Sequence, residues 1–140
     1  MKKLNFFILL LLSFSASTVL NSQDIYKFRA KYISHCFWEE NKQDWGEWSE
    51  YEGVNILIVI SFEDERITIY SNKTQFLDYY DYELTEEYNK KILFFKAIDN
   101  KGDRCSVKYV YFEDEDNRQL YVTYPGILGV VYEIKAMSKN

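Results

Sequence analysis

Alternation of apolar and polar residues runs through most of the chain, and it restricts the fold more than any other feature. In the segment VNILIVISF, residues 54–62, one face carries Val54, Ile56, Ile58, Ile60 and Phe62. Successive side chains of a β-strand point to opposite faces, so a period of two residues indicates strands with one buried face. The pattern therefore predicts a sheet rather than a bundle of helices.

The same period recurs along the chain between short turns rich in Asp, Asn, Glu and Gly. The further strands are predicted at residues 25–38, 66–71, 91–98, 104–112, 120–124 and 130–136. Residues 74–89 fit either an eighth strand or one short helix. Strands at this spacing predict an all-β fold, a single antiparallel barrel or sandwich of about seven or eight strands connected mainly as a meander.

The N-terminus has the layout of a secretory signal peptide. Lys2 and Lys3 precede an apolar run at residues 6–12, and small and hydroxylated residues follow at 13–18. The run is shorter than the roughly 20 apolar residues that span a bilayer. We therefore expect a signal peptide over residues 1–22, cleaved after residue 17 or 22, and a single β-rich domain over 23–140. The expected location is secreted or periplasmic, without membrane insertion after cleavage.

Net charge argues against nucleic acid as a partner. The chain has 17 basic and 22 acidic residues, and loss of Lys2 and Lys3 leaves 15 basic residues against 22 acidic ones, a net charge of −7. Nucleic acids and anionic lipid surfaces favour basic proteins. The expected partner is thus a small molecule, a glycan or another protein.

Two cysteines, Cys36 and Cys105, fall on the apolar faces of predicted strands. An oxidising compartment favours a disulfide between them, and we predict that bond. The alternative is two buried free thiols that pack as small apolar side chains.

Residues for covalent or metal chemistry are sparse. The single histidine, His35, is expected on the solvent face of its strand, opposite Cys36. The G-x-S-x-G motif is absent, and a zinc site needs several Cys or His ligands. No catalytic residues, metal or cofactor are predicted, and the chain is not expected to be an enzyme.

A small carboxylate-dependent hydrolase such as a glycosidase is the alternative, because that chemistry needs only two carboxyl groups. The acidic turns at residues 63–65 and 113–116 are interpreted as solvated hairpin ends.

One stretch, residues 36–53, contains all three tryptophans. Trp38 is in phase with the apolar face of its strand and is expected in the core. Trp45 and Trp48 lie in an acidic loop that leads to Tyr51, and these three are the candidate ligand-binding residues. Aromatic rings beside carboxylates suit a ligand with apolar faces and hydroxyl edges. In the alternative interpretation Trp48 plugs one end of a barrel and Trp45 is the more exposed ring.

Gly46-Glu47-Trp48 resembles the G-x-W motif that lipocalins carry near the start of their first barrel strand. The resemblance implies a barrel of lipocalin-like size with Trp48 at its base. The chain departs from that pattern because a long predicted strand, residues 25–37, precedes the motif. Only the architecture, and no ligand, is inferred from the resemblance.

These observations favour an exported, non-catalytic binding or interaction protein. It would recognise a small apolar ligand enclosed in the barrel, a glycan, or a protein partner. A hollow interior would favour the enclosed ligand, and a filled interior would favour recognition at the surface.

Overall fold

The computed structural model describes residues 25–137, which form nine β-strands. In chain order they are β1 (Ile25–Glu39), β2 (Asp44–Trp45), β3 (Glu52–Ser61), β4 (Arg66–Tyr70), β5 (Gln75–Glu87), β6 (Lys90–Ile98), β7 (Arg104–Phe112), β8 (Asn117–Tyr124) and β9 (Leu128–Ala136). The predicted signal peptide, residues 1–22, lies outside the described residues. Within residues 25–137 there is no helix that is long and apolar enough to cross a membrane. The all-β prediction is confirmed.

The segment that fitted either a strand or a helix is the strand β5. Leu77 and Tyr79 are both buried, with exposed Asp78 between them, as a period of two requires. Pairing with β4 on one side and β6 on the other satisfies much of its backbone. The helical alternative for residues 74–89 is therefore wrong.

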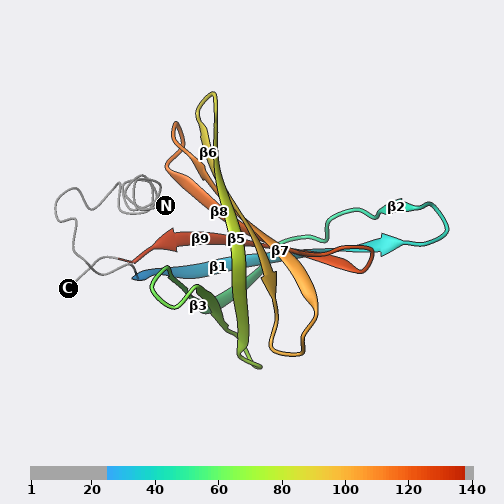
Figure 1. Ribbon diagram of the computed structural model, residues 1–140. Coiled ribbons are helices and arrows are strands. Elements are labelled where there is room, and N and C mark those ends of the chain that lie inside the picture. The colour runs from blue at the N-terminus through green and yellow to red at the C-terminus, as the bar shows by residue number, and fades with distance from the viewer. Residues whose placement is uncertain (1–24, 138–140) are drawn as a thin grey trace.

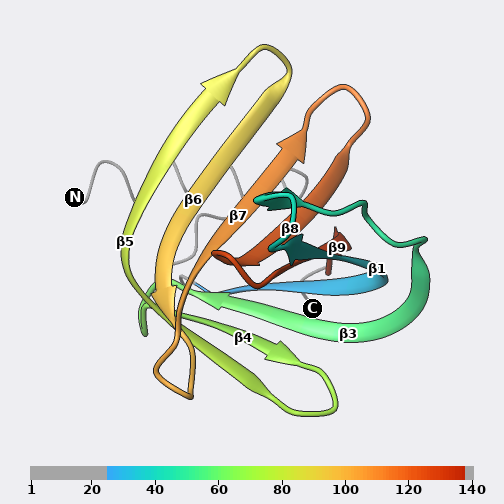
Figure 2. The same cartoon turned by 90° about the vertical axis from the view of Figure 1, so that its right-hand side faces the viewer.

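Eight strands close into an antiparallel barrel (Figures 1 and 2). Each strand from β3 to β9 pairs with the next, β3 pairs with β1, and β9 returns to pair with β1 from Phe28↔Ala136 to Phe37↔Leu128. Closure gives the apolar strands partners on both sides and limits the free edges at which chains aggregate. The short strand β2 is additional and pairs with the end of β1, where Trp38 faces Trp45.

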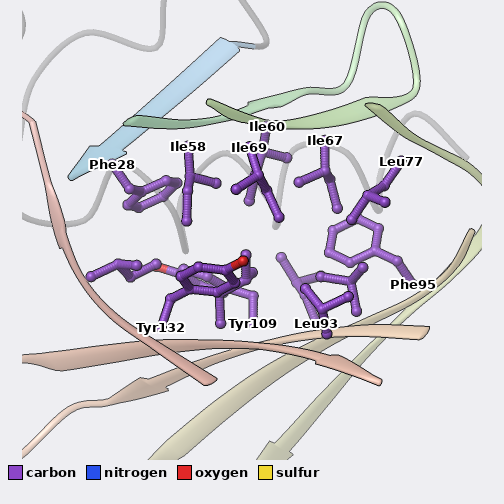
Figure 3. Packing of buried hydrophobic residues seen from close by; sticks show 14 of the residues in the cluster. Phe28, Ile58, Ile60, Ile67, Ile69, Leu77, Leu93, Phe95, Tyr109 and Tyr132 are labelled. Atoms are coloured by element: carbon purple, nitrogen blue, oxygen red, sulfur yellow. The ribbon is translucent and has the colours of Figure 1, made fainter. Parts of the chain in front are cut away.

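Side chains fill the interior of the barrel (Figure 3). Those from β1, β3, β4 and β5 face those from β6, β7 and β9 across the core. The labelled residues are at most 4% exposed: Phe28, Ile58, Ile60, Ile67, Ile69, Leu77, Leu93, Phe95, Tyr109 and Tyr132. An eight-stranded barrel can be filled by its own side chains or hold one small ligand, and the full burial of most of these residues shows the first case here.

Phe62, directly after β3, closes one end of the barrel. Its ring centroid lies 6.0–6.2 Å from those of Tyr26, Tyr79, Tyr82 and Phe95. Trp48 takes no part in this cluster and is 47% exposed on the outside. The expectation that Trp48 plugs the barrel, which the lipocalin resemblance also implied, is wrong. Trp45 is half-buried and is therefore not the more exposed ring of the two. β1 is already paired with β3 on one edge and with β9 on the other. The chain after β2 therefore runs back along the outside of β1, and this places Trp48 outside the barrel.

A β-bulge in β1 reverses the direction of its side chains. The register against β3 and β9 shifts between Ala30 and Tyr32. Before the shift alternate residues such as Phe28 point into the core, whereas after it Ile33 pairs with the core residue Tyr132. An offset of one residue exchanges the two faces of a strand. Tyr32, which alternation in phase with Phe28 would place in the core, is consequently 53% exposed.

The same reversal corrects the expectations for His35 and Trp38. His35 pairs with Val130, which packs against the core, and the imidazole is half-buried rather than on the solvent face. Trp38 is half-buried in the β1–β2 hairpin and is not part of the core. Alternation alone cannot anticipate these placements, because the bulge changes its phase.

Cys36 and Cys105 are buried free thiols, so the predicted disulfide is wrong and the alternative of two thiols holds. Cys36 pairs with Gly129 on the outer face of the barrel wall, whereas Cys105 belongs to the interior core. The two thiols therefore lie on opposite faces of the wall. Burial raises the pKa of Cys105 to about 11, and burial also raises the pKa of Cys36.

Candidate functional site

The structure separates Trp45 from the other two predicted ligand-binding residues. Trp45 lies on β2 in a hairpin that projects from the barrel (Figure 1), with its ring edge-on to Trp38 at 5.3 Å. The indole nitrogen of Trp38 donates to the carboxylate of Glu40 over 3.0 Å. Trp48 and Tyr51 instead lie on residues 46–51, an extended segment that we call the strap.

Hydrogen bonds fasten the strap to the outside of β1. The amide of Gly46 donates to the carbonyl of Phe37 over 2.8 Å, and the amide of Ser49 donates to the carbonyl of His35 over 2.7 Å. The hydroxyl of Ser34 donates to the carbonyl of Ser49 over 2.6 Å. These bonds place the strap at a fixed position over the second half of β1.

The indole of Trp48 packs on the outside of the barrel beside Gly129. A Cβ atom at Gly129 would lie 3.2 Å from the sulfur of Cys36 and 3.5 Å from Cη2 of Trp48. The Trp48 ring extends from there to Tyr121 on β8, edge-on at 6.1 Å between centroids. The tight approach is to the Cys36 sulfur, whereas the distance to the indole is an ordinary van der Waals contact, so the Trp48 ring packs beside Gly129.

Beside Trp48 a chain of polar groups runs across the outer faces of β8 and β9. The phenol of Tyr51 donates to Oε2 of Glu133 over 3.1 Å. The amide nitrogen of Gln119 donates to the same oxygen, and the phenol of Tyr121 donates to the amide oxygen of Gln119 over 2.8 Å. Each donor in this chain has one defined acceptor, which fixes the orientation of the Glu133 carboxylate and the Gln119 amide.

Glu133 contributes to raised pKa values of the two neighbouring phenols, Tyr51 and Tyr121. Burial raises the pKa of Tyr51, and the charge and hydrogen bond of Glu133 raise it further. Burial also raises the pKa of Tyr121, again with a contribution from the charge of Glu133. Both phenols thus keep their protons and act as donors at neutral pH. The ammonium group of Lys108 lies 4.8 Å above the Tyr121 ring, a cation–π contact.

Exposure and hydrogen bonding together define a candidate binding surface. We call it the outer platform; it consists of Trp48, Tyr51, Gln119, Tyr121 and Glu133. Its two strap rings are 47% and 52% exposed. It offers aromatic faces next to an oriented carboxylate and an oriented amide, an arrangement that can hold a ligand with apolar faces and hydroxyl edges.

A groove continues from the outer platform along the bulge of β1. It encloses about 550 Å³ and shares Glu133 with the platform. The residues that line it are Lys31, Tyr32, Gly53, Val54, Asn117, Glu133, Ile134 and Lys135. The ring of Tyr32, turned outward by the bulge, adds a third exposed aromatic side chain to this face.

The two acidic turns lie at hairpin ends, as the sequence predicted. Residues 63–65 and 113–116 are exposed at hairpin ends, and Asp116 lies 3.5 Å from Nη1 of Arg118. Within residues 25–137 no group of three or more His, Cys, Asp or Glu side chains is arranged to hold a metal ion.

A glycosidase needs a general acid with a raised pKa. Partial burial alone would raise the pKa of Asp99, but hydrogen bonds from Asp103, Tyr124 and Lys101 outweigh it and lower that pKa. Asp99 therefore does not have the property that this role requires.

Sequence reasoning found Trp48 and Tyr51 but missed the residues of β8 and β9 that contact them on the same outer face. Gln119, Tyr121 and Glu133 occupy outward positions of β8 and β9, and only barrel closure brings them to the strap. Their alternation with buried residues indicated that they lie on the outer face of their strands. It did not indicate which other segment of the chain lies beside that face. Comparison of the chain with family models, curated proteins and solved structures found no match.

Proposed function

We propose that the protein is a non-catalytic binding protein that recognises a glycan on the outer platform. The observation that carries this proposal is the combination of the half-exposed rings of Trp48 and Tyr51 with the hydrogen-bonded carboxylate of Glu133. A sugar has apolar C–H faces that stack on aromatic rings and hydroxyl edges that bond to carboxylates and amides. The platform offers both kinds of group side by side.

The filled interior favours surface recognition over an enclosed apolar ligand. The centre of the barrel is occupied by its own side chains, several of them fully buried, such as Ile58, Leu93 and Val107. Pre-orientation supports a specific site on the outside, because groups already held in place lose little entropy when a ligand arrives. Export to the periplasm or the cell exterior, predicted from the N-terminal segment, would place the platform where extracellular glycans occur.

Binding to an array of neutral and acidic glycans tests the proposal. The parent protein is expected to bind at least one class of glycan, and Trp48→Ala is expected to abolish that binding. Trp45→Ala is the matched control, because its ring lies in the hairpin and not on the platform. Retention of glycan binding in Trp48→Ala, or no glycan bound by the parent, would refute the proposal.

A further inference from the structure

Positive charge is concentrated on the outer faces of β1 and β9. Lys27, Arg29 and Lys31 alternate with the buried residues Tyr26, Phe28 and Ala30, and Lys135 follows the core residue Ile134 on β9. The ion pairs within residues 25–137 involve none of these four cations. A chain with a net charge of −5 thus carries an unneutralised basic stripe.

Two of these cations oppose each other directly. Arg29 pairs with Lys135 in the β1–β9 ladder. Like charges at directly opposed positions destabilise an antiparallel sheet. The arrangement therefore opposes folding in the free protein, and an anion placed between the two side chains would relieve it.

The basic stripe is continuous with the outer platform. Lys31 and Lys135 line the groove of about 550 Å³, Tyr32 is exposed there, and Glu133 belongs to both surfaces. A chain of sugar rings that stacks on Trp48 and Tyr51 would reach the groove at Glu133. Its next substituents would then meet Lys31 and Lys135.

We propose that the groove binds the anionic substituents of an acidic polysaccharide whose sugar rings occupy the outer platform. This inference rests on the proposed function and adds the charge of the ligand to it. Charge complementarity selects an acidic polymer, and the hydrogen-bonding groups of the outer platform select a polysaccharide. Glu133 and Gln119 can bond to sugar hydroxyls, whereas a nucleic acid binds mainly through many basic contacts to its phosphates.

Matched polymer pairs test the charge requirement. Isothermal titration calorimetry would compare dextran sulfate with dextran, and polygalacturonate with its carboxyl-reduced form. The acidic member of a pair is expected to bind about tenfold more tightly, the effect of roughly one charge-assisted hydrogen bond. That preference should shrink as salt rises from low to high concentration, because ions screen partly exposed charges.

Charge variants locate the effect. Lys31→Gln with Lys135→Gln is expected to remove the preference for the acidic polymer and to leave the melting temperature unchanged or raised, since the opposition to Arg29 is relieved. Lys73→Gln with Lys101→Gln is the matched control, with the same change in net charge at exposed turn positions. The control should bind as the parent does.

The outcomes separate this inference from the proposed function. Equal binding of neutral and acidic polymers, abolished by Trp48→Ala, would overturn the charge requirement and leave the glycan platform standing. Binding of no glycan would overturn both. Tighter binding of single-stranded DNA, or of vesicles of anionic phospholipid, than of any acidic polysaccharide would overturn the choice of ligand class.

Discussion

The phenol of Tyr51 donates a hydrogen bond to the carboxylate of Glu133 over 3.1 Å, although 82 positions separate the two residues in the chain. This bond ties the strap to the last strand of the barrel. It also joins the residues of the outer platform that the sequence predicted to those that it did not. The Glu133 carboxylate therefore positions the strap, and the same hydrogen bond holds the carboxylate in a fixed orientation toward a ligand.

Replacement of Glu133 should lower the pKa of Tyr51. Burial raises that pKa first, and the charge and hydrogen bond of Glu133 add to the increase. In Glu133→Gln the second contribution disappears, so the phenol should lose its proton at a lower pH than in the parent. NMR titration of labelled tyrosine ring carbons measures the change. Tyr132, whose raised pKa is caused by burial, serves as the internal control. An unchanged Tyr51 titration would show that the hydrogen bond does not form.

Truncation of Trp48 should weaken folding moderately. The ring packs beside Gly129 and Tyr121 but is 47% exposed. We expect Trp48→Ala to lower the free energy of unfolding by about 1–2 kcal/mol, below the roughly 3–5 kcal/mol typical of a fully buried indole. Trp45→Ala should cost less, because its ring contacts the projecting hairpin rather than the barrel wall. Urea midpoints of the two variants decide this, and a larger loss for Trp45→Ala would contradict the packing described for the strap.

The sequence predicted the barrel strands well because each has one buried face, and burial imposes a period of two. It failed within β1, where the bulge between Ala30 and Tyr32 changes the phase. A bulge leaves no mark in the amino-acid composition. Alternation counted without the bulge therefore placed Cys36 on the inner face of β1, whereas the structure has it on the outer face. The disulfide was predicted from that place, and it failed for the same reason.

The candidate site was only half visible for a different reason. Trp48 and Tyr51 stand close together in the chain and could be identified from local composition. Glu133 reaches them only because β9 closes against β1, and a strand carries no local signal of which strand will lie beside it. Long-range pairing, rather than residue type, determines the polar half of the outer platform.

Phe62 should be the costliest aromatic residue outside the strands. It contacts Tyr26, Tyr79, Tyr82 and Phe95 at one end of the barrel. Phe62→Ala should lower the free energy of unfolding by about 3 kcal/mol, from lost burial and lost ring contacts. Glycan binding should persist at concentrations of denaturant where the variant is folded. A urea midpoint close to that of the parent would show that Phe62 does not close the barrel.

Thiol reactivity should distinguish the two faces of the wall. Both thiols are buried and have raised pKa values, so both should react slowly with a thiol reagent in the native protein and fully after denaturation without reductant. Cys36 and Trp48 both lie next to Gly129 on the outer face, so Trp48→Ala should speed the labelling of Cys36 only, with Cys105 unchanged. Mass spectrometry of labelled peptides measures both rates. A failure to label either cysteine after denaturation would restore the disulfide.

Alkaline pH should destabilise the fold through Tyr132. Burial raises the pKa of Tyr132 from 10.0 to about 12. In the unfolded chain this phenol ionises near its ordinary pKa, whereas in the folded chain it stays protonated. The contribution of the buried phenol to the free energy of unfolding is therefore fully present below pH 10 and is lost as the pH rises to about 12. One such proton changes stability by about 1.4 kcal/mol per pH unit.

Tyr132→Phe should accordingly flatten the fall of the urea midpoint above pH 10. Tyr88→Phe is the matched control, because Tyr88 is 90% exposed and its replacement should leave the alkaline profile of the parent unchanged. Identical profiles for the two variants would mean that Tyr132 is not buried in the folded protein.

Pairing of β1 with β9 has a consequence for the order in which the molecule can be assembled. The first and last strands of the barrel join in a ladder from Phe28↔Ala136 to Phe37↔Leu128, so the longest-range contacts close the structure. Such contacts form slowly, because the intervening chain must give up its freedom before they are made. One edge of β1 can pair with β3, which follows it closely in the chain, but the other edge has no partner until β9 is present. Closure of the barrel by β1 and β9 is thus expected to be a late step of folding.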